Sequence, residues 1–183
     1  MTRIALAQMN CEKAAIAQNL QQIAALLAQA EARGVDILAL PEMCLTGYAD
    51  PTRYPEAMLR LDGPEIDHLL AVSRPSAITV LVGLIEHNPD AKPFITHVVV
   101  RQGKLRGVYR KVTIKDEEVA WFSPQSEYRP TEYLQHWVRF WFDEGLRLAA
   151  AKAVQRARLE RIALHWVGNR RLNDGGFSIA SVA

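Results

Sequence analysis

A strand–helix–strand pattern at the start of the chain constrains the fold most strongly. Residues 3–9 (RIALAQM) form a short apolar run that predicts a buried strand. Gly34 can end the following helix with a left-handed C-cap, and residues 35–40 predict a second buried strand. Two strands joined by a helix are expected to lie parallel in one sheet. The helix is predicted from apolar residues that recur every three or four positions, namely Ile16, Leu20, Ile23, Leu27 and Ala30.

The middle of the chain adds strands that run in both directions. A short helix is predicted at residues 66–73, and residues 77–86 (AITVLVGLIE) predict a third strand because they are rich in β-branched side chains. Residues 96–101 and 104–110 predict a hairpin, since Gly103 can take the positive φ that a tight turn requires. The sequence therefore predicts an α/β fold with a mixed sheet.

The pattern changes in character beyond residue 111. Residues 121–124 predict a loop, residues 138–142 a short strand, and residues 146–165 an Ala-rich helix. Residues 168–183 are polar and contain glycine with no clear period, so we expect them to form a loose tail.

Composition excludes several classes of protein. The 183 residues are 49% apolar and 23% charged, which is typical of a globular domain. The net charge of +2, without a dense Lys/Arg block, gives no reason to expect a nucleic acid or an acidic membrane as partner. No apolar run approaches the roughly 18–20 residues of a bilayer span, and no signal-peptide pattern precedes the first strand, so a cytoplasmic location is expected. The five histidines and two cysteines lack metal-ligand spacing, and no metal is expected.

Two charged residues stand where predicted strands end. Glu42 follows the strand at residues 35–40, and the carboxyl ends of parallel strands border the crevice in which ligands bind. Pro41 lacks an N–H group and helps to end strand pairing at this point. Lys111 ends the second strand of the hairpin. Each residue also has an ordinary interpretation, Glu42 as an exposed loop carboxylate and Lys111 as a solvated charge at a strand end.

Five segments, taken in order, resemble the N-terminal half of the nitrilase, or carbon–nitrogen hydrolase, superfamily. The resemblance covers about the first 125 residues and implies an α-β-β-α sandwich, of which this chain would hold an incomplete copy. It assigns residues 1–145 to the hydrolase domain and leaves residues 146–183 as a divergent helix and a loose tail. The segments are RIALAQMN, GVDILALPEMCLTGY, LVGLIE, GVYRKVTI and EEVAWFSPQSEYRP.

The resemblance implies hydrolysis of a small amide, carbamoyl compound or nitrile by a Glu-Lys-Cys triad without a metal or an organic cofactor. A thiol with a pKa of about 8.5 is mostly protonated at neutral pH, so a base must take its proton before it attacks. Glu42 matches this base, and Lys111 matches the ammonium that stabilises the tetrahedral intermediate. The second glutamate found in many members corresponds to Glu118, with Glu117 as a rival.

The nucleophile that the resemblance implies is not found in this chain. The family pattern Ile-Cys-Tyr/Phe-Asp matches best at residues 138–145 (VRFWFDEG), where Trp141 takes the position of the cysteine. Tryptophan has no attacking atom. Cys44 would project to the same side as Glu42 in an extended chain, but a buried cysteine commonly packs as a small hydrophobic residue. Cys11 has a weaker claim.

The length of the chain also departs from the family, whose members are usually longer. A shifted reading frame, a premature stop or a decayed gene copy would each explain why the N-terminal part resembles the family and the C-terminal part does not. Apolar faces meant for missing strands would then favour a homo-oligomer or pairing with homologous subunits. Two hypotheses remain: a carbon–nitrogen hydrolase that acts on a small amide or nitrile, and an inactive remnant that binds a ligand or homologous subunits.

Overall fold

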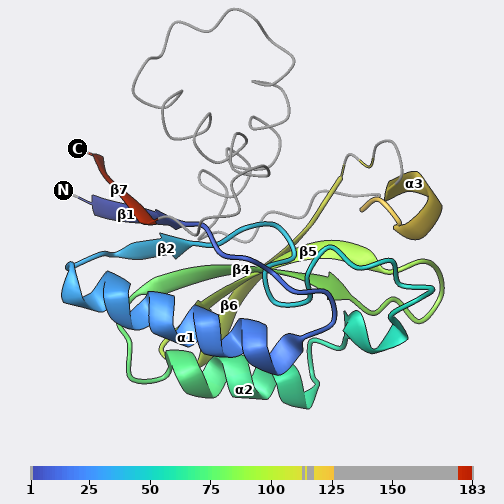
Figure 1. Ribbon diagram of the computed structural model, residues 1–183, viewed down its shortest axis with the longest axis horizontal. Helices are drawn as coiled ribbons and strands as arrows, with labels where there is room; N and C mark the ends of the chain where they lie inside the picture. The colour runs from blue at the N-terminus through green and yellow to red at the C-terminus, as the bar shows by residue number, and fades with distance from the viewer. Residues whose placement is uncertain (1, 113, 115–117, 126–176, 183) are drawn as a thin grey trace, which may run out of the picture.

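The computed structural model describes residues 2–112, 114, 118–125 and 177–182. These residues form one mixed sheet in the order β6-β5-β4-β2-β1-β7, with the short strand β3 paired to β4 (Figure 1). In chain order the elements are β1 (Thr2–Ala7), α1 (Ile16–Ala32), β2 (Ile37–Ala39), the 3-10 helix η1 (Pro55–Ala57), β3 (Met58–Leu59), α2 (Pro64–Ser73), β4 (Thr79–Glu86), β5 (Phe94–Arg101), β6 (Lys104–Arg110), α3 (Glu118–Trp121) and β7 (Phe177–Val182).

The strand–helix–strand unit at the start of the chain is confirmed. β1 and β2 pair in parallel with Ile4 opposite Ile37, and α1 connects them. Gly34 follows the end of α1 with φ of 62°, as expected for the residue that reverses the chain after a helix. β2 is shorter than the predicted strand. After Ala39 the chain passes into Leu40 and Pro41 and leaves the ladder, because proline cannot donate to a neighbouring strand.

The mixed sheet is also confirmed. β2 runs parallel to β4, whereas β5 is antiparallel to both β4 and β6. The turn of the predicted hairpin contains Gln102 with φ of 51° and Gly103 with φ of 69°, the two left-handed positions of a tight hairpin turn. β2, β4 and β6 consequently run in the same direction, so that their carboxyl ends lie at one edge of the sheet.

Four expectations for the second half of the chain need correction or fall outside the described residues. Part of the predicted loose tail, residues 177–182, forms β7 and pairs antiparallel with β1, whose edge would otherwise present unpaired N–H and C=O groups. Trp121, predicted to lie in a loop, ends the short helix α3. The predicted strand at residues 138–142 and helix at residues 146–165 lie outside the described residues.

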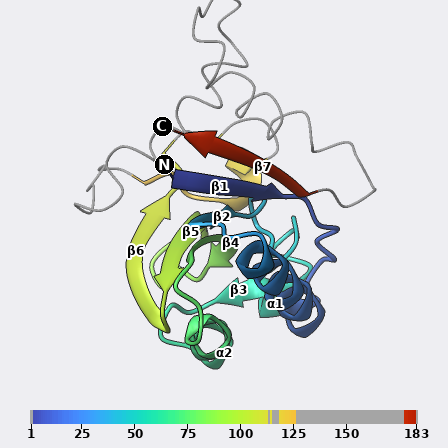
Figure 2. The ribbon, with the colours of Figure 1, turned by 90° about the vertical axis from the view of Figure 1, so that its left-hand side faces the viewer.

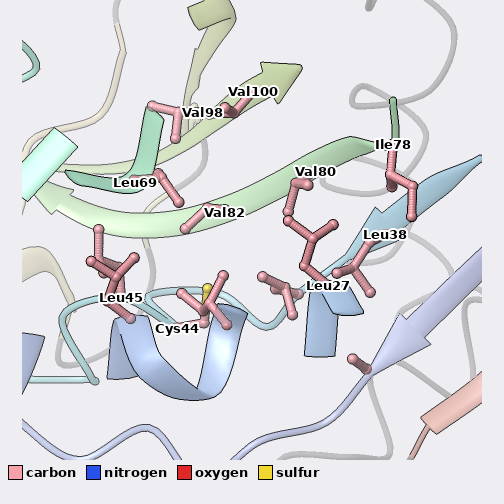
Figure 3. Packing of buried hydrophobic residues seen from close by; sticks show 14 of the residues in the cluster. Leu27, Leu38, Cys44, Leu45, Leu69, Ile78, Val80, Val82, Val98 and Val100 are labelled. Carbon is pink, nitrogen blue, oxygen red and sulfur yellow. The ribbon is translucent and has the colours of Figure 1, made fainter. Parts of the chain in front are cut away.

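The two longer helices cover the same face of the sheet. α1 and α2 lie side by side on that face in both views of the ribbon (Figures 1 and 2). No helix within the described ranges is long and apolar enough to cross a membrane. The helices bury their apolar sides against alternate residues of the central strands, as Figure 3 shows for Leu27, Leu69, Val80, Val82, Val98 and Val100.

The central strands are buried on both faces. On the side away from the helices, Leu81 of β4 and Val99 of β5 are also shielded from solvent. This explains why β4 reads as a continuous apolar run rather than as an alternating pattern. A second, smaller cluster of buried residues includes Met43, Ile95 and Phe122, next to the edge of the sheet where β2, β4 and β6 end.

Candidate functional site

Three charged side chains meet at the carboxyl ends of β2 and β6. The Nζ atom of Lys111 lies 2.8 Å from each carboxylate oxygen of Glu118 and 3.2 Å from Oε1 of Glu42. The side chains of Lys111, Glu42 and Glu118 are 5%, 13% and 7% exposed. The structure therefore brings together the three residues that the sequence singled out, while the rival Glu117 lies outside the described residues.

Main-chain hydrogen bonds hold Lys111 and Glu118 against each other. The N–H of Lys111 donates to Ile95 at 2.8 Å, and its carbonyl accepts from Gln125 at 3.0 Å. The segment that carries Glu118 returns over the start of β5, where the N–H of Ser123 donates to Pro93 at 2.9 Å. Glu118 thus reaches Lys111 because the segment that carries it lies beside the start of β5, where Lys111 is also bonded.

A partly buried ion pair next to the site connects the ends of β4 and β6 with the start of β5. Glu86 of β4 accepts hydrogen bonds from Thr96 of β5 at 2.7 Å and from Nε of Arg110 of β6 at 2.7 Å. The Arg110 guanidinium also lies over the ring of Phe94, 4.8 Å from its centre. Because Arg110 directly precedes Lys111, this network restrains the end of β6 from which the lysine projects.

The loop that carries Glu42 is compact rather than extended. The N–H of Cys44 donates to Pro41 at 3.2 Å, and the N–H of Gly47 donates to Met43 at 2.7 Å. Met43, directly after Glu42, is fully buried with φ of 55°, a conformation that costs energy for a residue with a side chain. The chain between Glu42 and Cys44 is therefore not extended, so the condition under which both side chains would project to the same side does not hold, and Cys44 packs in the core instead.

Gly83 of β4 lets this loop approach the sheet closely. A Cβ atom at Gly83 would lie 2.4 Å from the backbone nitrogen of Met43 and 2.8 Å from the carbonyl oxygen of Pro41, both too short for real contacts. The N–H of Leu45 donates to the Gly83 carbonyl at 2.9 Å. Gly83 was not singled out from the sequence. The feature that could have identified it is a glycine inside a strand rich in β-branched residues, which marks a close approach of another backbone.

Neither cysteine has the surroundings of a reactive thiol. Cys44 is fully buried in the core beneath the helices, where its Sγ contacts the N–H of Gly83 at 3.3 Å (Figure 3). Burial raises the pKa of Cys44 well above its usual value and the pKa of Cys11 to about 11. Both thiols are therefore protonated at neutral pH. Trp141, the position at which the nucleophile was expected, lies outside the described residues.

His97 of β5 is a buried titratable group that sequence reasoning also left unassigned. It is 3% exposed, and burial lowers its pKa to about 3. A hydrogen bond with the Leu40 backbone acts in the opposite direction, and the charge of Lys111 adds to the lowering. The ring is therefore neutral at pH 7. No group of three His, Cys, Asp or Glu side chains in the part of the chain described here is placed to hold a metal ion.

Replacing Lys111 should destabilise the protein strongly. In Lys111→Met the carboxylates of Glu42 and Glu118 lose their ammonium, and breaking such a buried pair costs about 3–5 kcal/mol. Urea unfolding measures this loss. The exposed Lys104→Met serves as control and should match the wild type. The double variant Lys111→Met/Glu118→Gln removes one uncompensated charge and should recover part of the stability; equal stability of the single and double variants would contradict the ion-pair interpretation.

The buried histidine predicts a specific dependence of stability on acid. Because the folded pKa of His97 is about 3 and the unfolded value is about 6.5, the unfolded state binds more protons between these limits. The contribution of the neutral ring is complete above pH 6.5 and is lost as the pH falls toward 3, by at most about 1.4 kcal/mol per pH unit. The stability difference between the wild type and His97→Gln, measured by urea unfolding, should fall across this window. A difference that stays constant would show that the ring is not buried in its neutral form.

Comparisons with known proteins give two kinds of relative. A 68-residue segment, 37% of this chain, is 62% identical to the CRISPR-associated endonuclease Cas1 of Pseudomonas aeruginosa and covers 21% of that protein. The glutamine-dependent NAD(+) synthetase of Thermotoga maritima is 32% identical over 133 residues, which make up 72% of this chain and 22% of the synthetase. The chain thus spans about a fifth of the length of these two curated relatives.

The fold matches that of a solved amidase. The amidase from Nesterenkonia sp. superposes with a TM-score of 0.63 at 24% identity, over 70% of this chain and 50% of the amidase. A double mutant of that amidase has also been solved in complex with acrylamide, and a single mutant with acrylamide added to the active-site cysteine.

Family membership follows from a match along most of the chain. Residues 3–152 match the family model of carbon–nitrogen hydrolases. The matched range contains β1 to β6 and all three charged residues of the candidate site. The chain therefore belongs to the carbon–nitrogen hydrolase family.

Proposed function

We propose that Glu42, Lys111 and Glu118 form the acid–base and oxyanion part of a site for hydrolysis of small amides, and that this chain does not itself complete the site. The observation that carries the proposal is the Lys111 ammonium, held between two carboxylates in a largely buried position. In these roles Glu42 takes the proton of a nucleophile, Lys111 stabilises the negative oxygen of the tetrahedral intermediate, and Glu118 orients Lys111.

The distances suggest how the lysine could serve an oxyanion. The ammonium has three N–H groups, two of which face the oxygens of Glu118 at 2.8 Å, while the contact with Glu42 is longer at 3.2 Å. When Glu42 accepts the proton of a thiol, its carboxylate becomes neutral and its attraction to Lys111 weakens. The N–H group that faced Glu42 is then released at the moment when negative charge develops on the substrate oxygen. Proton uptake and oxyanion binding would thus be coupled through one contact.

Small amides are the substrate class that the comparisons support best. The family is that of carbon–nitrogen hydrolases, and a double mutant of the amidase with the similar fold has been solved in complex with acrylamide. Carbamoyl compounds and nitriles remain alternatives. The chain has two cysteines, and both have raised pKa values and packing contacts. The second candidate, a noncatalytic domain that binds a ligand or homologous subunits, is favoured by this lack of a suitable thiol.

We also propose that the chain is composite, with a Cas1-like segment at its C-terminal end. The described strands up to residue 112 carry four of the five hydrolase segments in an unbroken sheet, which leaves the later part for the segment that is 62% identical to a Cas1 protein. If its 68 residues are the last 68 of the chain, this segment begins at residue 116 and includes Trp141. Trp141 would then replace no cysteine, because it belongs to a different sequence. The family match continues to residue 152, so the two matches would overlap.

In a composite chain the three charged residues would not all have the same origin. Glu42 and Lys111 lie well before residue 116, whereas Glu118 lies beside the proposed junction. The positioning role of Glu118 therefore rests on its contact with Lys111 and not on descent. Because the Cas1-like segment spans about a fifth of Cas1, we propose no nuclease activity for it. A cytoplasmic location, a homo-oligomeric state and the lack of a nucleic-acid partner stay predictions.

A hybrid enzyme tests the amide-hydrolysis proposal. The full chain should release no ammonia from acetamide or acrylamide, because it lacks a suitable nucleophile. A hybrid of residues 1–112 with the C-terminal half of the Nesterenkonia amidase, which would bring its active-site cysteine, should release ammonia. Glu42→Gln in the hybrid should lower the rate about 100-fold or more, whereas the exposed Glu56→Gln should not. A folded hybrid that works equally well with Glu42→Gln would refute the proposed base.

The composite origin is tested by reading the coding DNA beyond residue 112 in all three frames. A composite chain should show no hydrolase continuation in any frame, and Trp141→Cys should not bring ammonia release to the full chain. An Ile-Cys-x-Asp pattern followed by a long continuation in another frame would instead identify a frame error, and the composite proposal would fail.

A further inference from the structure

His97 lies where the loop of Glu42 meets the strands that lead to Lys111. It pairs with Gly83 across β4 and β5, so both residues belong to the sheet face that is turned away from the helices. A Cβ atom built on Gly83 would lie 2.9 Å from Cε1 of His97, and its other two close neighbours are backbone atoms of Met43 and Pro41. The imidazole and the peptide groups on either side of Glu42 therefore surround the same position above Gly83.

A hydrogen bond connects the same ring to the strand end that leads into the loop. The bond between His97 and the Leu40 backbone favours the protonated ring, which identifies the imidazole as donor and the Leu40 carbonyl as acceptor. The N–H of Leu40 donates to Leu81 of β4 at 3.2 Å. Leu40 is thus held through its N–H by β4 and through its carbonyl by β5, two residues before Glu42.

The chemistry of histidine suits this place better than that of other donors. The ring is buried and close enough to Lys111 to be affected by its charge. A neutral imidazole offers one N–H donor without placing a second positive charge near the lysine, which a lysine or arginine would do. An apolar side chain of similar size would fill the space but would leave the Leu40 carbonyl without its donor.

We propose that His97 is a positioning residue that sets the distance between Glu42 and Lys111 by fixing the backbone on both sides of Glu42. The inference rests on the proposed roles of that pair but concerns their geometry. Loss of the donor at His97 would free the Leu40 carbonyl, shift residues 41–43 and lengthen the contact between Glu42 and Lys111. The contact between Lys111 and Glu118 would persist, because neither residue depends on that loop.

Two substitutions of similar size in the full chain distinguish the effect of the N–H donor at residue 97 from the effect of the shape of the side chain. His97→Gln keeps an N–H donor at a similar reach, and His97→Met removes it. In protein labelled with 13C-glutamate, the carboxyl carbons of Glu42 and Glu118 are assigned from Glu42→Gln and Glu118→Gln. His97→Met should shift the Glu42 signal toward that of an unpaired carboxylate and leave the Glu118 signal in place, whereas His97→Gln should restore the wild-type position of both.

Val100→Ala is the matched control, since it weakens the same strand on the helix side of the sheet. It should leave both carboxyl signals unchanged. A Glu42 signal that stays in place in folded His97→Met, or that moves as far in Val100→Ala, would overturn the inference. If His97→Met does not fold, the test is made on the wild type. Its His97 imidazole N–H should exchange slowly and show nuclear Overhauser contacts to residues 41–43. The absence of such a signal would also overturn the inference. These signals report geometry whether or not the hybrid hydrolyses amides, so the two proposals fail separately.

Discussion

The buried ammonium of Lys111 needs carboxylate partners, and this need connects three separate parts of the chain. The lysine comes from the end of β6, Glu42 from the loop after β2, and Glu118 from the segment that folds back along β5. A charge with so little access to water is tolerated only where fixed opposite charges surround it. The compact loop over Gly83 and the ion pair between Glu86 and Arg110 restrain the elements that bring these charges together, and we propose the same role for the buried His97.

The site has well-ordered charged groups but no nucleophilic thiol among the described residues. Two carboxylates and one ammonium can exchange a proton and stabilise an oxyanion, but they cannot form the covalent intermediate that a thiol forms. Cys44 is close to Glu42 in sequence and yet packs in the hydrophobic core, because the chain turns at Met43 between them. Proximity along a chain therefore says little about a catalytic pair unless the backbone conformation between the two residues is known.

A composite origin would account for the mismatch between a well-formed sheet and an absent nucleophile. The strands up to β6 obtain their core from α1, α2 and one another, so this part can form its ladder and bring Glu42 against Lys111 without the later residues. The strand that would carry a nucleophile comes later in the family, in the part of the chain to which we assign the Cas1-like segment. The site residues encoded before that point keep their geometry because the packing of their own strands determines it.

The sequence by itself determined the architecture around the site. Apolar periodicity predicted α1, continuous β-branched runs predicted the central strands, and Gly34 and Gly103 marked the turns, because these signals depend on neighbours within a few residues. Glu42 and Lys111 could be singled out from their places at strand ends and from the family resemblance. Glu118 could only be ranked beside Glu117 until the return of the chain along β5 placed it against Lys111.

Tertiary structure alone decided the rest. β7 was missed because its partner, β1, lies at the far end of the sequence, and the role of Gly83 was missed because the backbone it accommodates is that of a loop some forty residues earlier. The burial of His97 and its bond to Leu40 also arise across strands that are distant in sequence. Local sequence specifies the strands and helices, but the contacts that turn three charged residues into one site exist only after the sheet has assembled.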